Sequence, residues 1–274
     1  MRPISLESAS TLGLPPLESV RLAARLGYQH VTTVLEPFRK SVEGHPHFSL
    51  RSDAALRRDL LSVLDDTGIS IASGEGIAIV PGRDVREAHL RDIEIMGELA
   101  IPRLTVVSLD PDLPSTFDQL ALLAELAGSF GIETLIEFVP IFPIRNIDIA
   151  LQAIEHVGRS DCRMMFDTMH FCRAGGRPEE IVHVDPNAIG YIQISDAPCE
   201  AVIPDYMNEA VCERMVPGEG ELPLAEILAE LPGDLVVGIE VPQRSAALAG
   251  VSLETRMARC LSATRRLLGQ DLTG

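Results

Sequence analysis

Residues 104–139 read LTVVSLDPDLPSTFDQLALLAELAGSFGIETLIEFV and contain one complete strand, helix and strand. The first and last runs, LTVVSL (104–109) and TLIEFV (134–139), are short, apolar and mostly without alternation, as in strands buried on both faces. Between them, FDQLALLAELAGSFG (117–131) has the longer apolar pattern of a helix and contains a late glycine suited to a left-handed cap. The pattern predicts two parallel strands joined by a right-handed helical crossover.

The same alternation of strands and helices continues through the rest of the chain. Further strands are expected at 4–8, 31–36, 69–74, 162–167, 191–195 and 235–241. Further helices are expected at 17–27, 55–68, 85–100, 147–158, near 177–184, and at 223–231 and 253–269. No glycine-rich phosphate loop of the kind found in open dinucleotide-binding or nucleotide-binding sheets is present. Eight strand-helix units therefore predict an α/β fold, a single (β/α)₈ TIM barrel domain over residues 1–274.

The charge of the chain limits the classes of partner. Forty acidic residues against 23 basic ones give a formal net charge of −17, which repels nucleic acid and anionic lipid. No secretory leader and no apolar run of about 18 residues is present, so we expect a cytoplasmic protein without a membrane partner. The five cysteines form no C-x-x-C pair and indicate free thiols. A small-molecule substrate is expected, and assembly into a homo-oligomer is compatible with the sequence.

Four oxygen-bearing side chains lie at or near the ends of four consecutive predicted strands: Glu137, Asp167, Gln193 and Glu240. The carboxyl ends of barrel strands face one mouth, so these side chains should converge there. Three carboxylates at such short range repel one another unless a cation neutralises them. Carboxylate and amide oxygens suit Mg²⁺ or Mn²⁺ better than a thiolate-loving metal. The sequence therefore predicts one divalent metal ion, Mn²⁺ or Mg²⁺, held by these four residues.

His170 follows Asp167 by three positions in FDTMHF (166–171) and is expected to donate a hydrogen bond to substrate beside the metal. Each of these residues also has a structural explanation. An isolated glutamate near a strand end commonly forms a surface salt bridge, and a histidine after a strand can be a packed, hydrogen-bonded residue.

Five short segments, in this order and spacing, resemble the xylose isomerase-like TIM barrel family over essentially the whole chain. They are IEFVP (136–140), FDTMHF (166–171), YIQISD (191–196), RMVPGEGELPL (214–224) and GIEVP (238–242). The family includes sugar-phosphate isomerases and epimerases, hydroxypyruvate isomerases, ketose 3-epimerases and 3-dehydroshikimate dehydratases.

The resemblance implies roles for single residues. Glu137, Asp167, Gln193 and Glu240 match the family's metal ligands, His170 matches its substrate-binding histidine, and Arg214 matches the arginine of its R-x-x-P-G motif. Gln193 replaces a histidine of many sugar epimerases and is similar to the hydroxypyruvate isomerase branch and some dehydratases. The alternative for Arg214 is a surface ion pair with a nearby acid, Glu213, Glu219 or Glu221.

The function expected from these residues is that of a metal-dependent isomerase or epimerase acting through an enediolate. Its substrate would be a small polyhydroxylated hydroxy-carbonyl compound: a sugar, a sugar acid or an inosose-like molecule. Glu137 and Glu240 are the expected catalytic carboxylates, because each can remove and return a proton beside the substrate. One alternative is a dehydratase of the 3-dehydroshikimate type, and another is a catalytically silent sugar-binding barrel. The long segment 196–213 is expected to form a lid.

Overall fold

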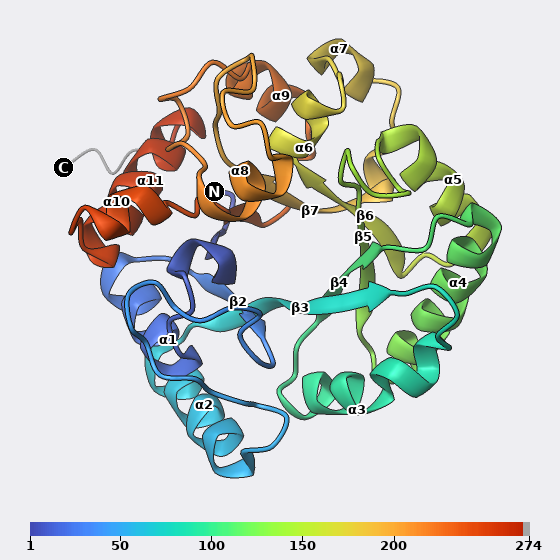
Figure 1. Ribbon diagram of the computed structural model, residues 1–274, viewed down its shortest axis with the longest axis horizontal. Helices are drawn as coiled ribbons and strands as arrows, with labels where there is room; N and C mark the ends of the chain where they lie inside the picture. The colour runs from blue at the N-terminus through green and yellow to red at the C-terminus, as the bar shows by residue number, and fades with distance from the viewer. Residues whose placement is uncertain (271–274) are drawn as a thin grey trace.

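A computed structural model describes residues 1–270, and it contains a closed barrel of eight parallel strands in the order β1 to β8 (Figure 1). The predicted (β/α)₈ architecture is therefore confirmed. The last four residues of the predicted domain, 271–274, lie outside the described residues. The strands are β1 Ile4–Leu6, β2 His30–Val34, β3 Ser70–Ile79, β4 Arg103–Ser108, β5 Glu133–Glu137, β6 Cys162–Asp167, β7 Ile189–Ile194 and β8 Val237–Ile239.

Helices surround the barrel on its outside (Figure 1). The α-helices are α1 Pro16–Leu26, α2 Ala54–Thr67, α3 Val85–Glu98, α4 Leu113–Ser129, α5 Ile147–Val157, α6 Thr168–Arg173, α7 Pro178–Ile181, α8 Tyr206–Cys212, α9 Leu224–Glu230, α10 Arg244–Leu248 and α11 Leu253–Leu267. Two 3₁₀-helices, η1 Ser8–Thr11 and η2 Pro186–Ala188, follow β1 and precede β7. In the part of the chain that these elements cover, every helix is too short or too polar to cross a membrane.

Most helix ends agree with their sequence signals. Gly27, Gly68 and Gly158 follow α1, α2 and α5 with positive φ angles, as a left-handed cap requires. Asp53 precedes α2 and its side chain accepts the N–H of Leu56, which satisfies one free donor of the first turn.

Several expected elements differ from the structure in their extent. The short helix expected near 177–184 is only the four-residue α7, whereas the unpredicted α6 follows β6 directly. A six-residue helix shows no apolar period, so only Asp167, whose side chain caps α6, could have indicated it. β3 runs to Ile79 rather than to residue 74, because the strand continues past a register shift between Gly74 and Ile77. β8 covers only 237–239 of the expected 235–241.

Alternation along the strands divides the barrel interior into layers. On β5, Glu133, Leu135 and Glu137 occupy every second position. Glu133 contacts Arg103 and Arg163 of the neighbouring strands by ion pairs. Leu135 belongs to a small buried cluster inside the barrel, made of Ala72, Leu135, Met165 and Tyr191. Glu137 therefore occupies the next layer, at the carboxyl ends of the strands.

A larger apolar core lies between the barrel and its helices and includes residues such as Leu120 on α4 and Ile136 on β5. The two cores fix both faces of the strands. The ends of the strands can consequently carry polar side chains without loss of the fold.

We predict that Gly238→Ala destabilises the protein and disturbs the barrel interior. A Cβ at Gly238 would lie 2.2 Å from Oε1 of Glu7 and 2.9 Å from the Tyr191 ring. Overpacking of this kind costs about 1–3 kcal/mol, which should lower the melting temperature by several degrees. The matched control is Gly233→Ala, where the nearest atom is 3.9 Å away. Equal melting temperatures for the two variants would contradict the prediction.

Candidate functional site

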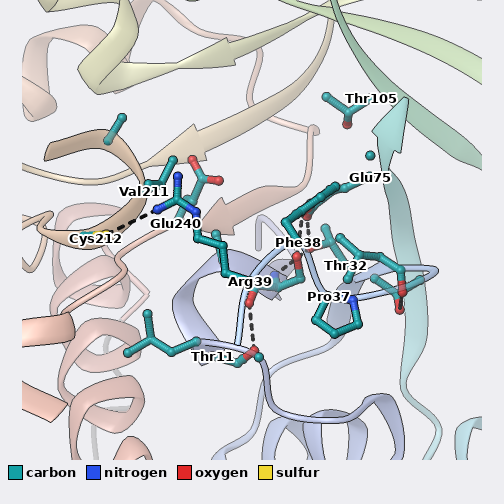
Figure 2. Close-up of a pocket in the computed structure, with 18 of the residues that line it drawn as sticks. Thr11, Thr32, Pro37, Phe38, Arg39, Glu75, Thr105, Val211, Cys212 and Glu240 are labelled. Atoms are coloured by element: carbon teal, nitrogen blue, oxygen red, sulfur yellow. Dashed lines mark hydrogen bonds between the residues drawn. The ribbon is translucent and has the colours of Figure 1, made fainter. Parts of the chain in front are cut away.

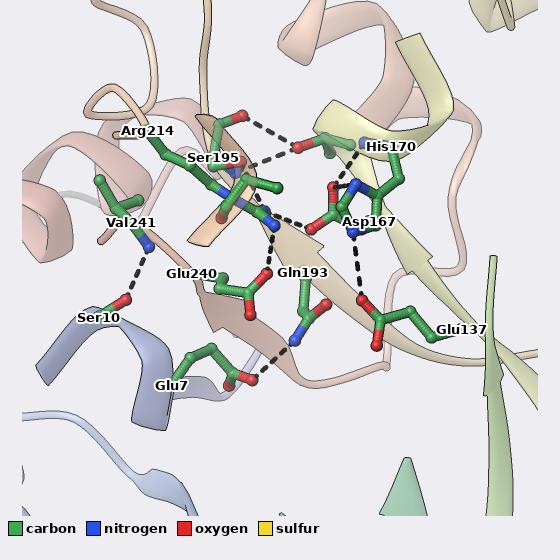
Figure 3. Close-up of polar contacts among 12 residues, drawn as sticks. Glu7, Ser10, Glu137, Asp167, His170, Gln193, Ser195, Arg214, Glu240 and Val241 are labelled. Atoms are coloured by element: carbon green, nitrogen blue, oxygen red, sulfur yellow. Dashed lines mark hydrogen bonds and ion pairs between the residues drawn. The ribbon is translucent and has the colours of Figure 1, made fainter. Parts of the chain in front are cut away.

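The four predicted ligand residues lie close together at the carboxyl ends of β5 to β8 (Figure 3). Glu137 is the last residue of β5 and Asp167 the last of β6. Gln193 on β7 is paired in register with Asp167, and Glu240 directly follows β8. The order along the chain therefore becomes the order around the mouth, as expected for a parallel barrel.

Arg214 lies at the centre of this group and is buried. Its Nη1 is 2.5 Å from Oδ2 of Asp167 and 3.2 Å from the Ser195 hydroxyl. Its Nη2 is 2.8 Å from Oε2 of Glu240, and its Nε donates to the carbonyl of Ala210 at 2.7 Å. The contact to Glu240 is ionic only, because that oxygen has no partner in hydrogen-bond geometry.

The surface alternative for Arg214 does not describe the structure. Glu219 instead pairs with Arg259, and Glu221 accepts the backbone N–H of Cys199 at 2.8 Å. Glu213 accepts from Ser245 at 2.9 Å.

His170, on α6, lies between Tyr206 and Glu137 and is 3% exposed. Its Nδ1 is 2.5 Å from the Tyr206 hydroxyl, and its Nε2 is 3.3 Å from Oε1 of Glu137. A neutral ring that donates from Nε2 to the carboxylate must accept at Nδ1, so the Tyr206 hydroxyl then donates to Nδ1. The backbone N–H of His170 also donates to Oδ1 of Asp167 at 2.7 Å.

Gln193 is oriented by Glu7, a residue just after β1. Nε2 of Gln193 donates to Oε2 of Glu7 at 3.1 Å, and the other carboxyl oxygen of Glu7 accepts from Tyr191 at 2.7 Å. Oε1 of Gln193 is buried and has no hydrogen-bond partner. An unpartnered buried amide oxygen is costly and is consistent with a ligand position.

Acidic side chains outnumber cationic ones at this mouth. Burial raises the pKa of Glu7 to about 8, and the nearby Glu75 carboxylate adds to the shift. Burial also raises the pKa of Glu75, against hydrogen bonds from Ser8 and Thr32. The pKa of Glu240 is raised well above its usual value by burial, which outweighs the charge of Arg214.

Asp167 has the opposite shift, although it shares the same arginine. Burial alone would raise its pKa, but the charge and hydrogen bond of Arg214 and the backbone N–H of His170 together lower it to about 2. Arg214 therefore stabilises the Asp167 carboxylate more than that of Glu240, in keeping with its shorter contact to Asp167.

The donor atoms of these residues are of the types that bind a divalent cation. The unpartnered oxygen of Gln193 is free to bind a cation, and a positive charge would stabilise the ionised forms of the buried carboxyl groups around it. Within residues 1–270, however, no three His, Cys, Asp or Glu side chains are arranged closely enough to hold a metal ion. The guanidinium of Arg214 lies between Asp167 and Glu240 and balances part of their charge.

A cavity of about 600 Å³ opens above these residues (Figure 2). Its polar lining includes Glu75, Glu137, His170, Gln193, Arg214 and Glu240. Much of the remaining wall is apolar, with Phe38, Phe48, Val139 and Phe142 among its residues. A cavity of this size accommodates a small organic ligand.

Glu7, Tyr206 and Arg39 were not singled out from the sequence. Glu7 follows a strand in the same way as Glu240 does, so the rule that polar residues at strand ends face the mouth could have found it. Arg39 lies in an irregular segment, and Tyr206 begins α8, a helix too short for an apolar period to indicate the direction of a side chain.

Comparisons with known proteins agree with this architecture. Residues 20–261 match the family model described as xylose isomerase-like TIM barrel. An inosose isomerase from Bacillus velezensis is 26% identical over 132 residues, which cover 46% of this chain and 46% of that protein. The match therefore spans about half the length of this curated relative.

Two solved structures show the same fold over 94% of this chain or more. The IOLI protein with a bound zinc atom has a TM-score of 0.79 and 18% identity, with 100% of both chains covered. The probable 3-DHS dehydratase AsbF from Bacillus anthracis has a TM-score of 0.74 and 14% identity, with 94% of this chain and 98% of that chain covered. With the family model matched over residues 20–261, the chain belongs to the xylose isomerase-like TIM barrel family.

Proposed function

We propose that the protein is a divalent-metal-dependent isomerase or epimerase of a small polyhydroxylated hydroxy-carbonyl compound. The observation that carries the proposal is the buried, unpartnered Oε1 of Gln193, set among the carboxylates of Glu137, Asp167 and Glu240. The partial match to an inosose isomerase supports this class of activity.

Glu137, Asp167, Gln193 and Glu240 would hold the ion, with Mn²⁺ or Mg²⁺ preferred by their oxygen donors. When bound, the ion would polarise the substrate carbonyl and acidify the neighbouring C–H group. Asp167 and Glu240 now share Arg214 as their counter-charge. A second cation at the same carboxylates would weaken that contact and make the guanidinium available to substrate oxygens.

The protein side chains then supply proton transfer and orientation. Glu137 or Glu240 removes the proton from the carbon beside the carbonyl, which leaves an enediolate. Return of the proton to the adjacent carbon gives the isomer, and protonation of the same carbon on its opposite face by the other carboxylate gives the epimer. Tyr206 fixes the His170 ring through Nδ1, so Nε2, which here contacts Glu137, can donate to a substrate oxygen in a constant orientation once Glu137 binds the ion. Loss of a β-hydroxyl from the same enolate would instead give a dehydratase.

The proposal is tested by metal binding and solvent exchange on the purified protein. We expect one Mn²⁺ or Mg²⁺ per chain by calorimetry after removal of bound metal with EDTA. Inososes, ketoses, hydroxypyruvate and 3-dehydroshikimate would then be incubated in D₂O and examined by mass spectrometry. Deuterium incorporation that disappears with EDTA and returns with the metal supports an isomerase or epimerase. Loss of water identifies a dehydratase, and binding without either reaction supports a silent sugar-binding barrel and refutes the enzyme proposal.

Asp167→Asn is expected to weaken metal binding at least tenfold while the barrel stays folded. Asparagine can still accept the N–H of His170, but it brings no charge to the ion or to Arg214. Because Glu240 still faces Arg214, we expect a loss of about 1–3 kcal/mol in stability. Calorimetry with Mn²⁺ and thermal unfolding measure the two effects. The control is Asp161→Asn, which removes an exposed ion pair with Arg159; wild-type metal affinity in Asp167→Asn would count against Asp167 as a ligand.

In the Tyr206→Phe variant, the His170 ring is expected to lose its preference for one tautomer. In the wild type, the neutral ring should carry its proton on Nε2, because Nδ1 accepts from the Tyr206 hydroxyl. Long-range ¹⁵N–¹H NMR spectra distinguish the two tautomers, and the variant should show a mixture of them. Tyr28→Phe is the matched control, since the buried Tyr28 hydroxyl bonds to the carbonyl of Met257 instead. A wild-type ring protonated only on Nδ1 would show that the assigned hydrogen-bond direction is wrong.

A further inference from the structure

Three cationic side chains line the cavity and are exposed to solvent: Arg39, Lys40 and Arg244. Arg39 and Lys40 belong to the segment between β2 and α2, and Arg244 begins α10. Lys40 is the only lysine of the chain. Among the described residues 1–270, none of the three forms an ion pair with a carboxylate. The positive charge at this rim therefore has no counter-charge within the described protein.

The acids nearest to Arg39 and Lys40 in sequence are engaged elsewhere. Glu36 pairs with Arg51 at 2.8 Å, and Glu43 pairs with Arg256 at 2.6 Å. The two acids of this segment thus neutralise arginines outside the rim. If these charges served only solubility, nothing would require the two acids to pair away from Arg39 and Lys40.

Arg244 is in the same situation on the other side of the mouth. The neighbouring Glu213 accepts both the backbone N–H of Ser245, at 2.9 Å, and the Ser245 hydroxyl, at 2.5 Å. The oxygen used for both bonds is the same one, Oε1, so Glu213 holds the start of α10 rather than the guanidinium.

The segment that carries Arg39 is docked over the cavity. Its base is closed by the hydrogen bond from Leu50 to the carbonyl of Leu35, at 2.7 Å. The ring of Phe38 packs on Gly76, where an added Cβ would lie 3.0 Å from the ring. Figure 2 shows Arg39 reaching toward Cys212 on the opposite side, and its Nη1 is 3.8 Å from the Cys212 sulfur. A thiol is a weak acceptor, so this guanidinium keeps its capacity to bind an anion.

The cavity consequently has two ends of opposite charge. Carboxylates and Gln193 lie at the base, exposed cations lie at the rim, and apolar side chains such as Val34 and Phe142 lie among them in the wall. A neutral polyol would need no uncompensated cation at the rim. The chain as a whole carries a charge of −17 and repels anions, so an anionic ligand requires a local positive site of this kind.

We infer, on the basis of the proposed function, that the substrate carries an anionic group at the end opposite its hydroxy-carbonyl group. Arg39 binds that group with the help of Lys40 and Arg244. A carboxylate and a phosphate share the required chemistry, because each accepts two parallel hydrogen bonds from a guanidinium.

Matched pairs of ligands test the inference by calorimetry on the Mg²⁺-loaded protein. D-fructose 6-phosphate is compared with D-fructose, and D-glucuronate with D-glucose, so that the members of each pair differ by one anionic group at the carbon farthest from the carbonyl. We expect at least one anionic member to bind at least tenfold more tightly than its neutral partner. The pair that shows this advantage identifies the anion as phosphate or carboxylate.

Arg39→Gln should reduce that advantage at least fivefold, and the triple variant Arg39→Gln, Lys40→Gln, Arg244→Gln should abolish it. The control is Arg58→Gln, an exposed arginine on α2 without an ion pair among residues 1–270, which should keep the full advantage. Equal affinities within both pairs, or an advantage that survives in the triple variant, would overturn the inference. Binding does not depend on turnover: failed deuterium exchange with an intact anion preference would refute only the proposed reaction.

Discussion

The buried contact of Arg214 with Asp167 and Glu240 is the interaction on which the mouth of the barrel depends. Several acidic side chains converge here because parallel strands place their carboxyl ends together, and burial makes their ionised forms unfavourable. One guanidinium with fixed donors offsets part of that cost. Removal of the arginine from such a group usually destabilises a protein by several kcal/mol, about 3–5, because the carboxylates stay buried without a counter-charge. The arrangement is therefore required for the stability of the barrel mouth, independently of any function.

Arg214 also determines where the long segment after β7 lies. Its backbone N–H donates to the carbonyl of Pro242, and Asp196 pairs with Met215 across the base of the segment. α8 is thereby held against α6, where Arg173 and Glu209 form a further ion pair at 2.7 Å. The segment 196–213 is the one expected to act as a lid. The part of it that contains α8 is attached to the barrel by these contacts. Through α8 it supplies the hydroxyl that faces His170 and the thiol that faces Arg39.

The sequence could predict the barrel and the convergence of four site residues because both follow from local patterns. Strands of unalternating apolar residues, separated by helices, predict a parallel sheet, and polar residues at the ends of such strands must face one mouth. Glu137, Asp167, Gln193 and Glu240 were found in this way. The acids that pair with Arg214 could not be predicted, because several acids were equally available along the chain and only the fold determines which of them lie beside it. Arg39 lies on irregular backbone and Tyr206 on the short helix α8, and neither gives a period from which the direction of the side chain could be predicted.

The pair formed by Glu7 and Gln193 gives a physical reason for an amide among the carboxylates of the mouth. A metal-binding histidine commonly donates its second N–H to a carboxylate, which fixes the ring and leaves the other nitrogen free. Gln193 does the same with different atoms: Nε2 donates to Glu7, and Oε1 stays unpartnered on the side of the site. The donor offered to an ion is then an oxygen rather than a nitrogen. Oxygen is the ligand that Mg²⁺ and Mn²⁺ prefer, whereas imidazole suits zinc, so an amide at this position favours the hard ions in the proposed enzyme.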